Sequence, residues 1–255
     1  MLRPFVHRGT ISIRYRCYER FYKTSLRTSD LQADFLSTRE LCVTDSYDLE
    51  RNFNAELVVD GGGNIGLFSL RAAAAYPSAK IIICEPLPRN VEQIQRHLDA
   101  NEVQAEILPA CLGGTRRTIP FYCRGANESS FDSTERYDKV MEIPVLLLQD
   151  AIGQSPAQRI LIKLDIEGME IEALTAFVST AEPRAIYVVG ELHHCPVNAP
   201  IMQRLFRDHG WTIEYFHIDQ DTSTFRACSP PAVPLLKWAT ALKSEASAQK
   251  VRVPS

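Results

Sequence analysis

Residues 56–66 read ELVVDGGGNIG, and this stretch decides the fold. Residues 56–60 predict a short buried strand, because a brief apolar run bounded by turn residues is typical of a strand covered on both faces. Asp60 ends the strand and three glycines follow it. The alanine-rich residues 64–76 predict a helix. A strand, a glycine loop and a helix together form the unit with which an open α/β sheet binds a nucleotide-like ligand.

Strands and helices alternate outward from this unit. Strands are predicted at residues 80–85, 105–112, 159–165, 185–192, 211–217 and 224–228, and helices at 31–41, 89–100, 167–178 and 199–210. Such alternation predicts an α/β fold: a doubly wound, Rossmann-like sheet of seven strands, mostly parallel. The last two strands are close enough in the chain to form an antiparallel terminal hairpin.

Three regions are predicted along the chain. Residues 1–50 form an N-terminal β/α extension, in which the alternation between Ile11 and Cys17 favours a strand over an amphipathic helix. Residues 51–230 form the cofactor-binding domain, with a β-rich insertion at 115–146. Residues 231–255 form a C-terminal helix or tail.

Composition excludes several classes of protein. Hydrophobic residues make up 45% and charged residues 23%, which is typical of soluble globular domains and not of disordered, collagen-like or coiled-coil chains. No apolar run approaches the roughly 18 residues of a membrane span. The net charge of −3, from 28 basic and 31 acidic residues, disfavours a nucleic-acid partner.

The cysteines and the N-terminus predict a cytoplasmic location. The seven cysteines are scattered and form no C-x-x-C pair, so neither a disulfide framework nor a zinc site is indicated. The first residues, MLRPFVHRGT, lack the apolar core of a secretory signal.

The glycine loop fits two cofactors. Gly61, Gly63 and Gly66 satisfy G-x-G-x-x-G, and Glu85 lies at the end of the next strand, as in dinucleotide-binding proteins. However, the carboxylate of Asp60 would repel a pyrophosphate and attract the ammonium and sulfonium groups of S-adenosylmethionine. The loop therefore favours S-adenosylmethionine, with Glu85 on its ribose. An NAD(P)-dependent oxidoreductase and a non-catalytic cofactor-binding scaffold remain as alternatives.

A second group of candidate residues follows two later strands. Asp165 and Glu167 follow the strand at 159–165, and Glu191 and His193 lie at the end of the strand at 185–192. The carboxyl ends of these strands face the ligand crevice. Asp165, Glu167 and His193 are therefore the predicted catalytic residues, with a histidine suited to act as general base. Asp165, Glu191 and a histidine could alternatively bind a divalent metal, but their spacing does not demand one, so none is predicted. Glu170 is expected to be solvated.

Four motifs, in their order, resemble the FkbM-type methyltransferases, which are class I S-adenosylmethionine-dependent O-methyltransferases. They are VVDGGGNIGLFSL (58–70), IIICEP (81–86), LIKLDIEGMEIEAL (161–174) and VVGELHH (188–194). The family usually has another residue in place of Gly61 and alanine in place of Gly63.

The resemblance implies roles for individual residues. The methionine part of the cofactor would lie along the loop and the ribose on Glu85, and the adenine would lie near the end of the third strand. The implied cofactor-binding residues are Asp60, Gly61, Gly62, Gly63, Asn64, Gly66, Glu85, Ala110 and Cys111.

The resemblance also implies O-methylation of a hydroxyl on a sugar, a glycan or another small natural product. The insertion at 115–146 is expected to shape the choice of acceptor, with Asn127, Ser129 and Ser130 as candidate contacts. The seven basic residues among the first 27 permit an anionic glycan as acceptor.

Overall fold

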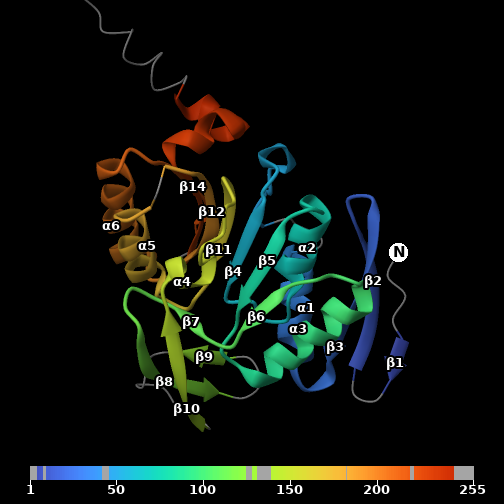
Figure 1. The fold of residues 1–255 in the computed structure, drawn as a ribbon. Helices are drawn as coiled ribbons and strands as arrows, with labels where there is room; N and C mark the ends of the chain where they lie inside the picture. Colours follow the sequence, from blue (N-terminus) through green and yellow to red (C-terminus); the bar gives the residue numbers. More distant parts are fainter. Residues whose placement is uncertain are drawn as a thin grey trace, which may run out of the picture.

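A computed structural model describes residues 5–7, 10–41, 46–124, 128–130, 139–181, 183–218 and 221–243. Its centre is a seven-stranded sheet in the order β13-β14-β12-β11-β4-β5-β6 (Figure 1). The parallel strands are β4 (Leu57–Gly61), β5 (Lys80–Cys84), β6 (Glu106–Leu108), β11 (Arg159–Leu164) and β12 (Ala185–Leu192). The strands β13 (Thr212–Ile218) and β14 (Ser223–Cys228) form an antiparallel edge. The predicted fold class is confirmed.

Helices cover both faces of this sheet (Figure 1). One face carries α2 (Leu67–Ala75) and α3 (Pro88–Asn101), and the other carries α4 (Leu148–Ile152), α5 (Glu170–Val178) and α6 (Cys195–Asp208). Side chains alternate between the faces along each strand, so Val58 packs with α2 and α3 whereas Leu57 and Val59 pack with α4 and α5. Burial on both faces explains why these strands read as continuous apolar runs.

The N-terminal residues form a separate antiparallel sheet of β1 (Phe5–His7), β2 (Thr10–Cys17) and β3 (Arg20–Arg27). The strand expected from the alternation is present. Polar contacts join β3 to α3: the Ser25 N–H lies 2.9 Å from His97 Nε2, and the Gln93 amide donates to the Ser25 carbonyl at 2.8 Å. The division into regions 1–50, 51–230 and 231–255 stays a prediction.

The stretch from β3 to β4 runs through η1 (Thr28–Asp30), α1 (Leu31–Arg39) and η3 (Arg51–Phe53). At the other end of the chain, η4 (Pro230–Leu235) is followed by a helix at 237–243. The rest of the helix predicted at 235–250 lies outside the described residues.

The insertion forms a third sheet, as its β-rich pattern predicted. Its strands are β8 (Arg117–Arg124), β9 (Glu128–Ser130) and β10 (Lys139–Leu146), together with β7 (Cys111–Leu112), in the order β7-β10-β8-β9. The single strand predicted at 105–112 is therefore wrong in extent: β6 joins the central sheet and β7 joins this one. Pro109 separates the two, because proline has no N–H to donate to a ladder. Asn127 lies outside the described residues, and only the backbone of Ser129 and Ser130 is described.

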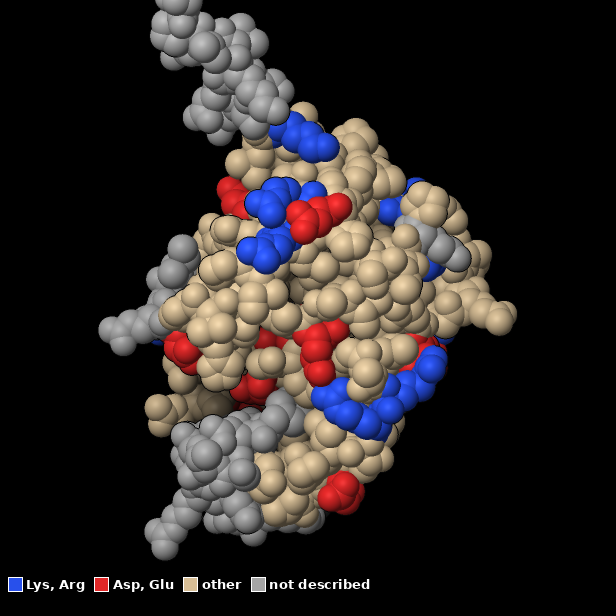
Figure 2. Space-filling view, turned by 90° about the vertical axis from the view of Figure 1, so that its left-hand side faces the viewer, with Lys and Arg blue, Asp and Glu red and all other residues tan. Residues whose placement is uncertain are grey.

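Two surface features bear on partners. No helix among the described residues has the length and apolar character needed to cross a bilayer. Figure 2 shows that Lys and Arg on the face it displays lie in separate groups beside Asp and Glu, with no continuous basic patch among the residues coloured there.

Candidate active site

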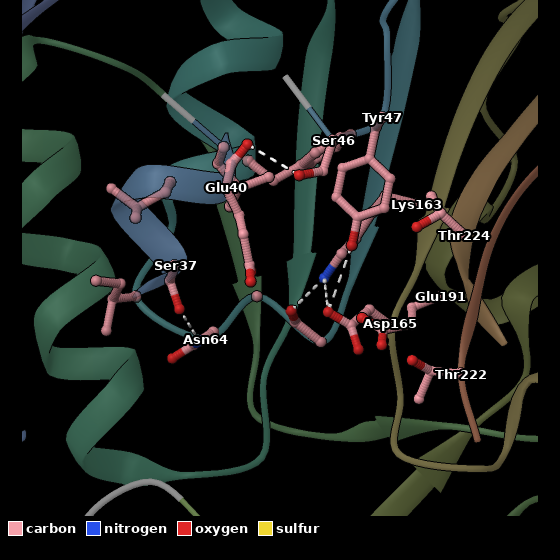
Figure 3. A pocket seen from close by; sticks show the side chains of 16 residues that line it. Ser37, Glu40, Ser46, Tyr47, Asn64, Lys163, Asp165, Glu191, Thr222 and Thr224 are labelled. Carbon is pink, nitrogen blue, oxygen red and sulfur yellow. Dashed lines mark hydrogen bonds and ion pairs between the residues drawn. The ribbon is translucent and has the colours of Figure 1, made fainter. Parts of the chain in front are cut away.

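Two adjoining cavities open beside the glycine loop. The larger, of about 630 Å³, is lined by the loop, by Asp165, and by residues of the N-terminal segment between Ser37 and Tyr47 (Figure 3). The smaller, of about 100 Å³, is lined by residues that include Glu85, Leu87, Ala110, Cys111, Phe121, Ile166 and Glu167. Gly62, Asn64 and Asp165 line both cavities. The structure thus gathers the ends of β4, β5 and β11 around one space.

Close packing explains the glycines of the loop. Gly62 has a φ of +77°, and a Cβ there would lie 1.9 Å from the carbonyl oxygen of Asp165. A Cβ at Gly63 would lie 2.4 Å from Ile83 Cγ2. Position 62 therefore requires glycine for both space and conformation. The alanine usual at position 63 in the family would need Ile83 to move.

Asp60 lies beneath the loop. Its side chain is fully buried, and its Oδ2 accepts a hydrogen bond from Ser69 Oγ at 2.7 Å. Its Oδ1 is 3.5 Å from Lys163 Nζ. Burial raises the pKa of Asp60, while Lys163 lowers it. Asp60 does not line either cavity, and neither does Gly61 or Gly66, so any effect of these three residues on a ligand passes through the loop.

Lys163 connects the loop to Asp165. It is a buried residue of β11, and its Nζ donates to the carbonyls of Gly61 at 3.1 Å and Gly62 at 2.6 Å. The same nitrogen is 3.7 Å from Asp165 Oδ2. Burial disfavours the charged lysine, but Asp165 and Asp60 outweigh that effect and raise the pKa of Lys163. From the sequence, Lys163 was expected to pair with Asp165 only indirectly, as a residue two positions away on the same face of the strand, and its contacts with the glycine loop were not predicted.

Glu85 reaches the smaller cavity in a buried position. Its Oε2 accepts the N–H of Asn64 at 2.8 Å, and its Oε1 accepts the N–H of Leu87 at 3.0 Å and the Asn90 side-chain amide at 3.2 Å. Burial raises the pKa of Glu85 to about 7, against the effect of these hydrogen bonds. Glu85 therefore ties the glycine loop to the start of α3.

Carboxylates dominate the larger cavity. Asp165 accepts a hydrogen bond of 3.4 Å from the buried Tyr47 hydroxyl, and Figure 3 shows Tyr47, Lys163 and Asp165 converging there. Glu40 and Glu191 also line the space. Burial, followed by the charge of Asp165, raises the pKa of Glu191, and burial followed by the charge of Glu191 raises that of Glu40. Sequence reasoning missed Glu40 and Tyr47, which lie outside the sheet motifs.

His193 faces two carboxylates rather than either cavity. Its Nδ1 lies 3.0 Å from Glu170 Oε1, and its Nε2 lies 3.7 Å from Glu167 Oε2. Burial opposes the charged form, but the hydrogen bond to Glu170 and the nearby carboxylates raise the pKa of His193 to about 9. Partial burial and the charge of Asp165 raise the pKa of Glu167 to about 7, although its side chain is 52% exposed.

Glu170 corrects one expectation. The side chain predicted to be solvated is fully buried. Its Oε1 accepts the backbone N–H groups of Ile166 at 3.0 Å and Gly168 at 3.2 Å. Glu167 and Gly168 have positive φ values of 57° and 99°, so α5 begins at Glu170 instead of at residue 167. Glu170 therefore stabilises the turn that carries Asp165 and Glu167.

The central sheet and its glycine loop define a Rossmann-like fold of the kind that binds nucleotide-like cofactors. The sequence model of the family "Methyltransferase FkbM domain" matches residues 60–212, which are more than half of the chain. The chain therefore belongs to the FkbM methyltransferase family. This assignment favours methyl transfer over the oxidoreductase and scaffold alternatives.

Two fungal relatives are similar to this chain. "Methyltransferase 1" of Beauveria bassiana (strain ARSEF 2860) is 26% identical over 167 residues, which cover 56% of this chain and 67% of the relative. "Methyltransferase sdnD" of Sordaria araneosa is 26% identical over 219 residues, which cover 72% of this chain and 84% of the relative.

A solved structure, that of methyltransferase FkbM from Methylobacillus flagellatus KT, is similar with a TM-score of 0.47 and 16% identity. The match covers 78% of this chain and 53% of that one, so this chain spans about half of that protein's length.

Proposed function

We propose that this methyltransferase transfers the methyl group of S-adenosylmethionine to a hydroxyl oxygen of a neutral sugar or related natural product. The observation that carries the proposal is the position of Asp165. Asp165 lines both cavities, so it lies between the space next to Glu85 and the larger space next to Tyr47. Such a group can contact a cofactor and an acceptor at once.

The residues present fit the cofactor. The oxygens of Glu85 at the smaller cavity suit ribose hydroxyls, and the apolar surface of Leu87, Phe121 and Ile166 beside them suits an adenine ring. Ala110 and Cys111 line the same space. The acidic larger cavity suits the ammonium and sulfonium groups. When bound, S-adenosylmethionine supplies a methyl group activated by its positively charged sulfur.

The chain's own residues orient the acceptor and take up its proton. Asp165 accepts the hydrogen bond, and then the proton, of the acceptor hydroxyl, while Tyr47 and Lys163 fix its carboxylate. His193 does not take this role, because a group with a pKa of about 9 is already protonated at neutral pH. We keep Glu167 in the proposed catalytic set because it lines the smaller cavity next to Asp165.

The charge of the larger cavity favours a neutral acceptor. Its ionisable lining residues are Glu40, Tyr47, Lys163, Asp165 and Glu191, and the lysine is already bonded to the glycine loop. An anionic glycan would meet three carboxylates. The basic residues of β2 and β3 do not line the cavity, which argues against the anionic acceptor that the N-terminal charge permitted.

Calorimetric titration with S-adenosylhomocysteine, with NADH in parallel, tests the cofactor. We expect binding of S-adenosylhomocysteine alone, weakened at least tenfold in Glu85→Ala, since two buried acceptor oxygens are lost. Binding of NADH alone would overturn the proposal.

Transfer of a radiolabelled methyl group to a panel of neutral sugars and polyols tests the reaction. Asp165→Asn should lower kcat by roughly 10²–10⁴-fold, as loss of a general base does, and change cofactor affinity little. Full turnover in this variant would remove the role of Asp165.

A further inference from the structure

Three side chains that bind metals in other proteins meet beside the smaller cavity. Asp165 follows β11, Glu167 lies in the turn before α5, and His193 follows β12. One oxygen or nitrogen of each lies within 4.8 Å of the others. We propose that Asp165, Glu167 and His193 bind a divalent cation. The sequence analysis placed Asp165 and His193 at one edge of the sheet but predicted no metal, because their spacing does not demand one, and the metal it considered included Glu191 in place of Glu167.

The orientation of His193 supports the site. Its Nδ1 is bonded to the carboxylate of Glu170 at 3.0 Å, which leaves Nε2 directed toward Glu167. Histidine ligands of metals usually donate their other ring nitrogen to a carboxylate in this way. A cation on Nε2 would replace the proton that this nitrogen otherwise shares with Glu167. Glu170 is fully buried, so its interaction with His193 is shielded from water and is not one of the weak, solvent-exposed ion pairs of a protein surface.

The same glutamate holds the segment that carries the other two ligands. Its Oε1 accepts the N–H groups of Ile166 and Gly168, which flank Glu167 in the chain. One buried carboxylate therefore positions all three ligand-bearing residues. Its second oxygen, Oε2, is buried and has no hydrogen-bond partner in the described part of the chain. A buried acceptor without a partner is unfavourable, so the interior here carries negative charge that is only partly compensated.

The ion pairs of Asp165, Glu167 and Glu170 also leave part of the negative charge uncompensated. Asp165 pairs with Lys163 at 3.7 Å, but that ammonium already donates to two carbonyls of the glycine loop. Among the described residues, the ion pairs of Glu167 and Glu170 are both with His193. Three carboxylates thus share one imidazole and a lysine engaged elsewhere. A divalent cation would supply the missing positive charge.

The donor set restricts the metal. One imidazole and two carboxylates suit Mn²⁺, Zn²⁺ or a similar first-row ion, whereas Mg²⁺ prefers oxygen ligands alone. Three protein ligands leave coordination positions open. Because Asp165 also lines the larger cavity, an acceptor oxygen could take one of them. This last role rests on the proposed function, whereas binding of the cation does not.

Manganese binding to the full chain tests the site. Protein freed of metal with a chelator is titrated with MnCl₂, and free Mn²⁺ is followed by its paramagnetic resonance signal. We expect one equivalent of Mn²⁺ to bind with micromolar affinity, and ZnCl₂ to compete for the site more strongly than MgCl₂. His193→Gln and Glu167→Gln should each weaken binding at least tenfold. Glu170→Gln, which alters only a positioning residue, should weaken it by roughly 10–100-fold.

His194→Asn is the matched control. His194 is the adjacent histidine, its side chain is 68% exposed, and asparagine tolerates its positive φ of 52°. This variant should bind Mn²⁺ as the unmodified chain does. Thermal melts confirm that each variant is folded, and Glu167, at the surface, is the ligand whose replacement disturbs the fold least.

Two results would overturn the inference: no stoichiometric binding of Mn²⁺ or Zn²⁺, or equal binding by the unmodified chain and the folded Glu167→Gln variant. A parallel titration with S-adenosylhomocysteine separates the two proposals. If S-adenosylhomocysteine binds and the metals do not, only the cation site fails. If the metals bind and S-adenosylhomocysteine does not, the proposed function fails.

Discussion

Lys163 is the residue on which the glycine loop depends most directly. Replacing it by methionine keeps the length of the side chain but removes both hydrogen bonds to the loop carbonyls and leaves Asp60 without its ion pair. We expect Lys163→Met to weaken S-adenosylhomocysteine binding at least tenfold, because the loop carbonyls lose the charged donor that holds them in place. Calorimetry measures the change in affinity.

A second substitution separates charge from loop geometry. Lys163→Met should also lower thermal stability, because it leaves Asp60 as a buried carboxylate without its ion pair. The double variant Asp60→Asn/Lys163→Met removes that carboxylate, so much of the thermal stability should return while cofactor affinity stays low. Lys80→Met, on the exposed start of β5, is the control and should bind S-adenosylhomocysteine normally. Unchanged affinity in Lys163→Met would show that the lysine only balances charge.

Residues differ in how visible their roles are in the sequence. The positions of Asp60, Glu85 and Asp165 were predictable because each lies at the end of a buried strand, and strand ends meet at one edge of a parallel sheet, but the burial of Asp60 beneath the loop, away from both cavities, was not. Lys163 was not assigned because an isolated cation in a strand does not reveal its partners. Glu170 was wrongly expected to be solvated, since a glutamate early in a helix is ordinarily exposed; the positive φ at Glu167 redirects it inward.

At the scale of elements, the strands and helices of the central sheet follow from local periodicity, whereas the contribution of the N-terminal segment does not. Tyr47 contacts Asp165 across 118 positions of sequence. A similar long-range chain of contacts runs from β3: Arg27 donates to Asn90 at 2.9 Å, and Asn90 donates to Glu85 at 3.2 Å. Such contacts depend on how elements pack, which one sequence does not show.

This chain of contacts leads to a prediction for β3. Arg27 also forms a buried ion pair of 2.7 Å with Asp34 on α1. Arg27→Gln should lower the free energy of unfolding by about 3–5 kcal/mol, because Asp34 is left as an unpaired buried charge. Urea denaturation measures this loss, and S-adenosylhomocysteine affinity should fall with it as Asn90 loses its partner.

Arg14→Gln serves as the control for this prediction. Arg14 is an exposed residue of β2 that lies over the ring of Phe21, so its loss should change stability by less than about 1 kcal/mol. A loss in Arg27→Gln no larger than that in Arg14→Gln would show that β3 is not tied to the cofactor site through this pair.

At the scale of the whole molecule, the buried Glu85 and the partly buried His193 make stability fall as pH rises above about 6.5, whereas burial lowers the pKa of His97 and acts in the opposite direction below that pH. The pKa of Glu85 rises from its ordinary 4.5 to about 7, and that of His193 rises from 6.5 to about 9. A raised folded-state pKa means that the folded chain holds its proton more tightly than the unfolded chain does. The stabilisation from Glu85 is therefore complete below pH 4.5 and lost as pH rises through 7; that from His193 is complete below pH 6.5 and lost as pH rises through 9.

Without ligand, the melting temperature should therefore fall between pH 6.5 and pH 9, where His97 is neutral in both states, and calorimetric melts across that range measure the slope. Glu85→Gln cannot ionise, so it should flatten the part of the profile below about pH 7.5 and leave the part near pH 9 unchanged. Glu92→Gln, at an exposed position on α3, should keep the full profile. In the proposed binding mode, the ribose hydroxyls of S-adenosylhomocysteine donate to the ionised carboxylate of Glu85, so this ligand should raise the melting temperature more at pH 8 than at pH 6. A melting temperature that rises between pH 6.5 and pH 9 would contradict the inference that Glu85 and His193 hold their protons more tightly in the folded chain.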